Sequence, residues 1–140
     1  MADYFTNFSF MFTLPNQEAQ AYALELASHG SSGNLGDELP PDFPKELADV
    51  VEDWCFEADA DTAENKPALW LHSSSGGIDA VCAFVQHLLN KFNLNERVTF
   101  EWSNDCSKPR LDAFGGGAAI VTATEIKTMS TFEWLQKHAA

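Results

Sequence analysis

Hydrophobic and polar residues alternate near the start of the chain. One side of this pattern is occupied by Phe8, Phe10, Phe12 and Leu14. A period of two predicts a β-strand over 8–14 with one buried face. Asn16 then offers an N-cap for a helix over 16–29, and Gly30 is expected to end it. The Gly- and Pro-rich stretch 30–43 predicts a long surface loop inserted before the next helix.

In the rest of the chain, the spacing between apolar residues changes several times. Apolar residues at helical spacing predict a helix over 44–58, which an acidic loop over 57–67 follows. A short apolar run predicts a strand over 68–72, and a strongly amphipathic segment predicts a helix over 78–92. Strands are expected over 97–102 and 118–124, with the glycines of 115–117 in the hairpin between them. Ser130 and Glu133 form a capping box that opens a last helix through 138.

The order of these elements predicts an α+β fold of a single domain, 1–140. The order is β-α-α-β-α-β-β-α. Two strand-to-strand links run through helices, which favours parallel neighbours, and the last link is a wide hairpin, which favours an antiparallel pair. We therefore expect a small mixed four-stranded sheet with helices packed on it. The residues expected to be buried together are Phe8, Phe10, Phe12, Trp70, Val85, Leu88 and Ile120.

Composition narrows the class of protein further. A chain of 140 residues with 45% hydrophobic residues needs neither a metal nor a disulfide to hold its core. Three cysteines without a C-x-x-C pair indicate reduced thiols, and Cys55 and Cys82 are expected to be small buried hydrophobic residues. No apolar run is long enough to span a bilayer, and no signal peptide is recognisable. These features predict a soluble, cytoplasmic protein.

Charge is the most unusual property of the sequence. The formal net charge is −13, and 11 of the 21 acidic residues lie between Asp37 and Glu64, where Lys45 is the one basic residue. This segment carries a charge of −10. A chain of this charge repels phosphate, so direct binding to nucleic acid or to an anionic membrane is not expected. A basic protein partner would instead be attracted to this chain, because opposite charges attract.

An acidic stripe on the expected second helix points to such a partner. Glu46, Asp49, Asp53 and Glu57 follow helical spacing, and each like-charge neighbour costs a helix about 0.2–0.5 kcal/mol. A solvated helix face would account for this stripe, and so would a surface that meets a basic, nucleic-acid-binding protein. The second interpretation predicts an interaction module that acts as an accessory or inhibitor protein. Its partner-binding residues are then Asp42, Glu46, Asp49, Asp53, Glu57, Asp59 and Asp61.

The loop over 73–77 supports an alternative function, that of a small enzyme or a ligand-binding protein. It joins a strand to a helix, where backbone N–H groups form anion sites. The residues that would bind an anion are Ser74, Ser75, Gly76 and Gly77. No Lys follows as in a phosphate-binding P-loop, and a Ser cap with a glycine turn accounts for the same residues.

Other chemistry receives little support from the sequence. A nucleophilic triad of Ser75, His87 and Asp79 lacks the hydrolase pattern G-x-S-x-G, and His87 is expected to face solvent. The acidic run from Asp59 lacks the glycine and the terminal Glu of a calcium loop. We therefore expect no catalytic residue, no metal and no cofactor. Small acidic accessory proteins of phages and plasmids, including nucleic-acid mimics, are similar in size and charge, but no motif identifies a family.

Overall fold

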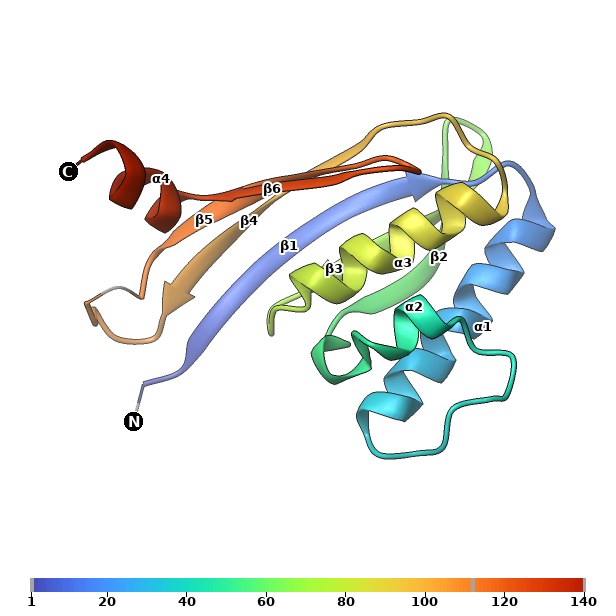
Figure 1. The fold of residues 1–140 in the computed structure, drawn as a ribbon, viewed down its shortest axis with the longest axis horizontal. Coiled ribbons are helices and arrows are strands. Elements are labelled where there is room, and N and C mark those ends of the chain that lie inside the picture. The colour runs from blue at the N-terminus through green and yellow to red at the C-terminus, as the bar shows by residue number, and fades with distance from the viewer. Residues whose placement is uncertain (1, 112, 140) are drawn as a thin grey trace.

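The computed structural model describes residues 2–111 and 113–139, which form one sheet with helices (Figure 1). The strands are β1 (Tyr4–Thr13), β2 (Glu57–Ala63), β3 (Lys66–Ser73), β4 (Val98–Cys106), β5 (Gly115–Val121) and β6 (Ile126–Ser130). The helices are α1 (Gln17–Asn34), α2 (Lys45–Ala48), the short 3₁₀ turn η1 (Val51–Asp53), α3 (Ile78–Lys91) and α4 (Thr131–His138). The expected α+β class is confirmed. Within the described residues, no helix is long and apolar enough to cross a membrane.

The sheet has six strands in the order β2-β3-β1-β4-β5-β6, and every neighbouring pair is antiparallel. The expectation of a mixed four-stranded sheet is therefore wrong. The helical crossover from β3 through α3 does reach a strand of the same direction, β4, but β1 lies between the two. The crossover from β1 to β2 is interrupted in the same way by β3. Each inserted strand runs the opposite way and makes both contacts antiparallel.

Strand β2 occupies residues that the sequence pattern assigned to a helix end and an acidic loop. Only α2 and η1 remain of the helix expected over 44–58. From Trp54 to Asp61 the sequence alternates between apolar or small residues and exposed ones, which is a strand pattern that the helical spacing before it masked. Glu64 and Asn65 both have positive φ, 53° and 63°, as a two-residue hairpin requires.

The glycines near β5 are part of a strand rather than of a hairpin loop. Gly115 alone among them has a positive φ, and Gly116 and Gly117 pair with β4. A Cβ on Gly117 would overlap the indole ring of Trp102, so the close approach of this ring accounts for the glycine. The chain then turns into β6, a strand that was not expected from the sequence.

Helix α1 continues past Gly30, which was expected to end it, and reaches Asn34. Gly30 is buried, and a Cβ at this position would overlap the ring of Trp54. A glycine normally weakens a helix by about 1 kcal/mol. Here the absent side chain lets Trp54 pack directly against the helix backbone, so the glycine serves packing and not termination.

Gly30→Val is expected to lower the free energy of unfolding by about 1–3 kcal/mol, because the added side chain collides with Trp54 in a filled core. Ser31→Val is the matched control, since Ser31 is the next residue of α1 and is exposed. Its effect is expected to stay within about 1 kcal/mol. Urea denaturation of both variants measures the difference, and equal losses would mean that the contact with Trp54 is unimportant.

The core lies between one face of the sheet and helices α1 and α3. Phe8, Phe12, Val85 and Leu88 are buried as expected, and Phe10 is half-buried. Trp70 and Ile120 are exposed, so their placement in the core is wrong. Both belong to the opposite face of the sheet, because Trp70 pairs with Met11 and Ile120 pairs with Lys127, and paired residues share a face.

Candidate functional site

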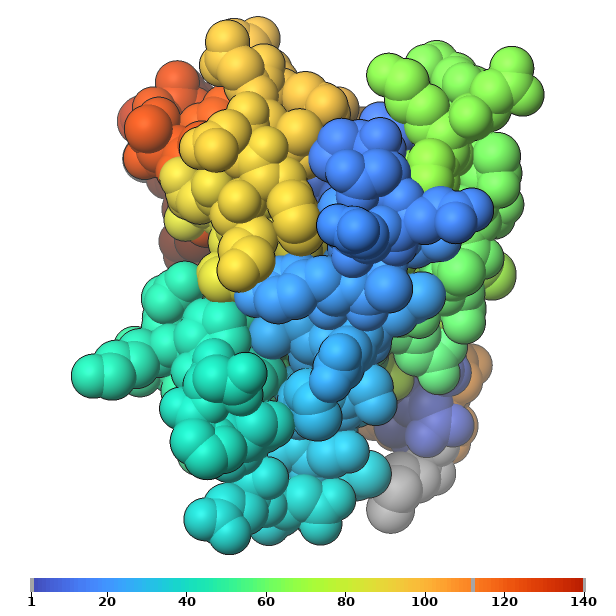
Figure 2. Space-filling model, turned by 90° about the vertical axis from the view of Figure 1, so that its right-hand side faces the viewer, coloured from blue at the N-terminus to red at the C-terminus, as the bar shows by residue number. Residues whose placement is uncertain are grey.

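The acidic segment is exposed along nearly its whole length. Of the eleven carboxylate residues from Asp37 to Glu64, ten are exposed and Asp53 is partly buried. Figure 2 shows their segments on one side of the molecule, where the chain from the end of α1 to η1 (cyan to teal) and strand β2 (green) flank α1. Within the described residues, no Lys or Arg forms an ion pair with any of these carboxylates.

The continuous acidic helix stripe is not present. Glu46 lies on α2, Asp49 follows that helix, Asp53 is in η1 and Glu57 begins β2. The chain leaves the helical path so that Trp54 and Phe56 can enter the core, where both are buried. The acidic residues therefore do not share a helix face, and those of β2 point to the sheet face opposite the helices, as the exposed Trp70 that pairs with Asp59 does.

Strand β2 presents a second, more regular row of carboxylates. Glu57, Asp59 and Asp61 alternate along the strand, so they point to the same face of the sheet at intervals of about 6.6 Å. His72 on β3 lies beside them, with Nε2 2.6 Å from Asp59 Oδ2 and Nδ1 3.6 Å from Glu57 Oε2. The ring of Trp70 stacks on His72 at 3.8 Å between centroids and fixes its orientation.

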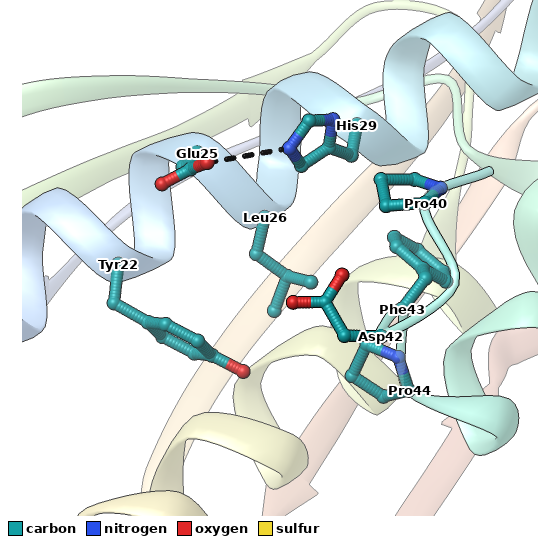
Figure 3. Close-up of a pocket in the computed structure, with 8 residues that line it drawn as sticks. All are labelled: Tyr22, Glu25, Leu26, His29, Pro40, Asp42, Phe43 and Pro44. Carbon is teal, nitrogen blue, oxygen red and sulfur yellow. Dashed lines mark ion pairs between the residues drawn. The ribbon is translucent and has the colours of Figure 1, made fainter.

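A pocket lies between α1 and the segment that leads into α2 (Figure 3). Its cavity volume is about 150 Å³, and it is lined by Tyr22, Glu25, Leu26, His29, Pro40, Asp42, Phe43 and Pro44. The first four of these residues occupy one face of α1, at helical spacing. Tyr22 and Phe43 give the pocket aromatic surface, while Glu25 and Asp42 place carboxylates at it.

A hydrogen-bonded chain supports the Tyr22 side of this pocket. Tyr22 Oη lies 2.8 Å from His87 Nε2, and His87 Nδ1 lies 2.9 Å from Glu46 Oε1. Lys91 Nζ is 4.9 Å from the centre of the Tyr22 ring, which is a cation–π distance. The expectation that His87 faces solvent is wrong, because its side chain is only 13% exposed. These three residues are far apart in the sequence, so no local pattern indicated the hydrogen bonds between them.

Burial and two neighbouring carboxylates act on the Tyr22 hydroxyl at the pocket. Burial raises the pKa of the Tyr22 hydroxyl, and the charges of Asp42 and Glu46 raise it further. A hydrogen bond from its own backbone N–H and then the contact with His87 lower the pKa of Glu46, which is therefore ionised at neutral pH. A neutral Tyr22 with a raised pKa is a poor nucleophile. The hydrogen-bonded residues beside the pocket are therefore better suited to position side chains and to carry charge than to form a covalent intermediate.

The loop over 73–77 already has an internal carboxylate beside it. Asp53 Oδ2 accepts a hydrogen bond from the N–H of Ala80, in the first turn of α3, at 3.1 Å. Gly76 N donates to Thr6 O, and Ser75 N donates to Ser73 Oγ. A bound anion would compete with Asp53 for this helix terminus. Of the expected partner-binding residues, Asp53 thus has a capping contact within the chain.

The cysteines differ from one another in accessibility. Cys82 is buried, and burial raises the pKa of its thiol to about 12, with smaller contributions from Asp79 and Asp53. Cys55 is exposed, so the expectation that it is buried is wrong. It lies between Trp54 and Phe56, whose side chains take the core positions of this alternating stretch. Among the described residues, no group of three or more potential metal ligands comes together.

The fold is that of an α+β protein with an exposed acidic segment over 37–64. No protein-family model, no curated protein and no solved structure matches the chain.

Proposed function

We propose that this protein is an acidic interaction module that binds a basic protein through the surface formed by residues 37–64. The observation that carries the proposal is the exposure of ten carboxylates in this segment without a Lys or Arg ion pair in the described structure. Carboxylates in such a group repel one another, and a cationic partner relieves that repulsion. The partner class favoured by this charge is a nucleic-acid-binding protein, whose basic surface the module would occupy as an accessory or inhibitor.

The geometry of β2 supports this partner class. Its carboxylates at Glu57, Asp59 and Asp61 form a straight row with a spacing similar to that of phosphates along one nucleic-acid strand. A basic groove that follows a phosphate backbone would meet the same sign of charge at similar intervals. This row replaces the helix stripe as the regular part of the proposed surface.

The pocket beside Tyr22 supplies a place for a single cationic side chain of the partner. Its volume of about 150 Å³ is that of a cavity able to hold a benzene-sized group, and the planar guanidinium of Arg is smaller than that. Arg stacks on aromatic rings and pairs with carboxylates, and Phe43 with Asp42 offers both kinds of contact. The proposed function therefore combines long-range attraction by the surface with one defined contact.

The test compares two triple variants with equal net charge. Asp42→Asn/Asp49→Asn/Glu52→Gln removes three exposed carboxylates from the proposed surface, and Glu96→Gln/Glu101→Gln/Asp105→Asn removes three exposed carboxylates elsewhere. The probe is a short peptide of alternating Arg and Gly. We expect the first variant to slow association by about tenfold at low ionic strength, and added salt to reduce this difference, because steering between exposed charges is screened.

The control variant decides between a local surface and net charge alone. If both variants slow association equally, the peptide senses only the overall charge and the proposed surface is wrong. If the first variant binds as the unchanged protein does, the carboxylates form only a solvated surface. A glutamate-containing peptide of the same length should bind to none of the three proteins.

A further inference from the structure

The sheet face opposite α1 and α3 carries exposed hydrophobic side chains where β1 and β3 lie side by side, and we call it the outer face. Trp70 on β3 is 39% exposed, and Met11 on β1 is 41% exposed. Their neighbours along the two strands are buried and point to the core; they are Leu69, Leu71 and Phe12. Because side chains alternate between the two faces of a strand, Trp70 and Met11 lie together on the outer face.

The strand register places three different kinds of side chain in one line across the outer face. Met11 pairs with Trp70, and Trp70 pairs with Asp59 on β2, so an apolar, an aromatic and an acidic residue follow one another. We call these three residues the cross-strand row. Neighbouring strands lie about 4.8 Å apart, so the row extends over about 10 Å. The outer face therefore presents three chemical properties in a fixed order.

The ring of Trp70 is held in place by two contacts. Its Nε1–H group donates a hydrogen bond to Ser9 Oγ at 2.8 Å, and the ring stacks on His72 with 3.8 Å between centroids and 22° between planes. His72 Nε2 lies in turn 2.6 Å from Asp59 Oδ2. A side chain that is already ordered loses little conformational entropy when a ligand binds. An exposed but ordered Trp is therefore well suited to anchor a partner, as Trp often does in interfaces.

Charge determines which kind of group the cross-strand row fits. Glu57, Asp59 and Asp61 point to the outer face from β2, and within the described residues no Lys or Arg forms an ion pair with them. A second copy of the chain would bring the same carboxylates together, which repulsion opposes. A cationic group is attracted instead, and its charge is expected to lie toward Asp59.

We propose that the cross-strand row binds an arginine side chain of the basic partner, an inference that rests on the function proposed above. The apolar stem of the arginine lies along Met11, its planar guanidinium stacks on the exposed part of Trp70, and its N–H groups donate to the carboxylate of Asp59. Lysine has a compact ammonium group that does not stack as a plane, so the row selects arginine over lysine. This contact is distinct from the pocket beside Tyr22, which α1 and the segment before α2 form.

The test compares two peptides of equal length and charge, one of alternating Arg and Gly and one of alternating Lys and Gly. A salt concentration of about 150 mM screens the distant charges and leaves the direct contact. Proton–nitrogen NMR spectra report the indole N–H groups of the four Trp residues, and the signal of Trp70 is the one lost in Trp70→Leu. We expect the Arg peptide to shift this signal and to bind about threefold more tightly than the Lys peptide.

Two matched pairs of variants locate the contact. Trp70→Leu is expected to remove the preference for the Arg peptide, and Trp134→Leu, at a Trp that is 53% exposed on α4, to keep it. Asp59→Asn is expected to weaken binding of the Arg peptide about threefold, and Asp37→Asn, at an exposed residue outside the sheet, by less than about 1.5-fold. The second pair leaves the Trp70 ring in place, and circular dichroism checks the fold of every variant.

The outcomes separate this inference from the proposed function. If neither peptide binds the unchanged protein even at low ionic strength, the proposed function and the arginine contact are both wrong. If the two peptides bind equally, or if Trp70→Leu keeps the preference for the Arg peptide, the proposed function is unaffected and the contact with the cross-strand row is wrong. A neutral peptide of alternating Leu and Ser that shifts the Trp70 signal as strongly also overturns the inference, because the outer face would then select apolar groups.

Discussion

Trp54→Ala is expected to lower the free energy of unfolding by about 3–5 kcal/mol, the range measured for large aromatic residues in cores. The ring is 2% exposed and lies 5.0 Å from Phe56 and 5.7 Å from Phe84 between centroids. It also fills the space left by Gly30, so removal of the ring opens a cavity next to a helix backbone. Collapse of this cavity is opposed by two layers, α1 on one side and α3 on the other.

The control for this prediction is Trp134→Ala. It makes the same chemical change at a residue that is 53% exposed, so its effect on unfolding is expected to be below about 1 kcal/mol. Urea denaturation measures the free energy of unfolding of both variants. Gly30→Val should also cost less in the Trp54→Ala background than alone, because the ring that it overlaps is gone. Additive effects would contradict the contact.

Leu88→Ala is expected to cost about 2–5 kcal/mol, which is a large part of the stability of a typical domain. Leu88 is a fully buried residue of α3. Phe10→Ala is expected to cost less than removal of a fully buried Phe, because Phe10 is only half-buried, although its ring stacks on Phe100 at 4.4 Å between centroids. A comparison of the two variants therefore tests whether the loss of stability follows the buried fraction of each side chain.

Leu35→Ala provides the comparison for Leu88→Ala, since Leu35 is 83% exposed. Its effect is expected to stay within about 0.5 kcal/mol, as for other surface changes. Thermal unfolding followed by circular dichroism ranks the variants. A Leu88→Ala midpoint equal to that of the unchanged protein would mean that α3 packs on the sheet through another face.

Elements with a strong local pattern were predictable from the sequence. The amphipathic segment of α3 begins at Ile78 as expected and ends one residue before the expected limit. The N-cap of α4, which is one half of the expected capping box, is confirmed, because Ser130 Oγ accepts a hydrogen bond from Glu133 N at 3.1 Å. β1, β3 and β4 were recognised from alternation or from a short apolar run. In each case neighbouring residues alone carry the information, which is why sequence reasoning succeeds.

Elements whose pattern depends on distant partners were not predictable in this way. The alternation that forms β2 begins at Trp54, inside a stretch whose leucine and valines also fit a helix, and only pairing with β3 decides between the two. β6 has five residues, which are too few for a clear period. The antiparallel arrangement follows from the insertion of β1 between β3 and β4, and no local pattern records that order.

The acidic surface was visible in the sequence only in part. Exposure of the 37–64 carboxylates follows from their composition, since charged residues rarely enter a core without partners. The capping role of Asp53 and the contact of Glu46 with His87 join residues 27 and 41 positions apart. Contacts over such separations depend on the sheet order, so the pocket beside Tyr22 emerged only from the structure.

The central position of β1 delays completion of the sheet while the chain is synthesised. β1 pairs on one side with β3 and on the other with β4, and Asn7 meets Ser103. At about 5–20 residues per second, the ribosome needs roughly 5–20 s to travel from the end of β1 to the end of β4. Throughout that interval the phenylalanine-rich first strand has an unpaired edge. The period of greatest exposure to aggregation is therefore set by the rate of translation, and codon choice between these two strands changes its length.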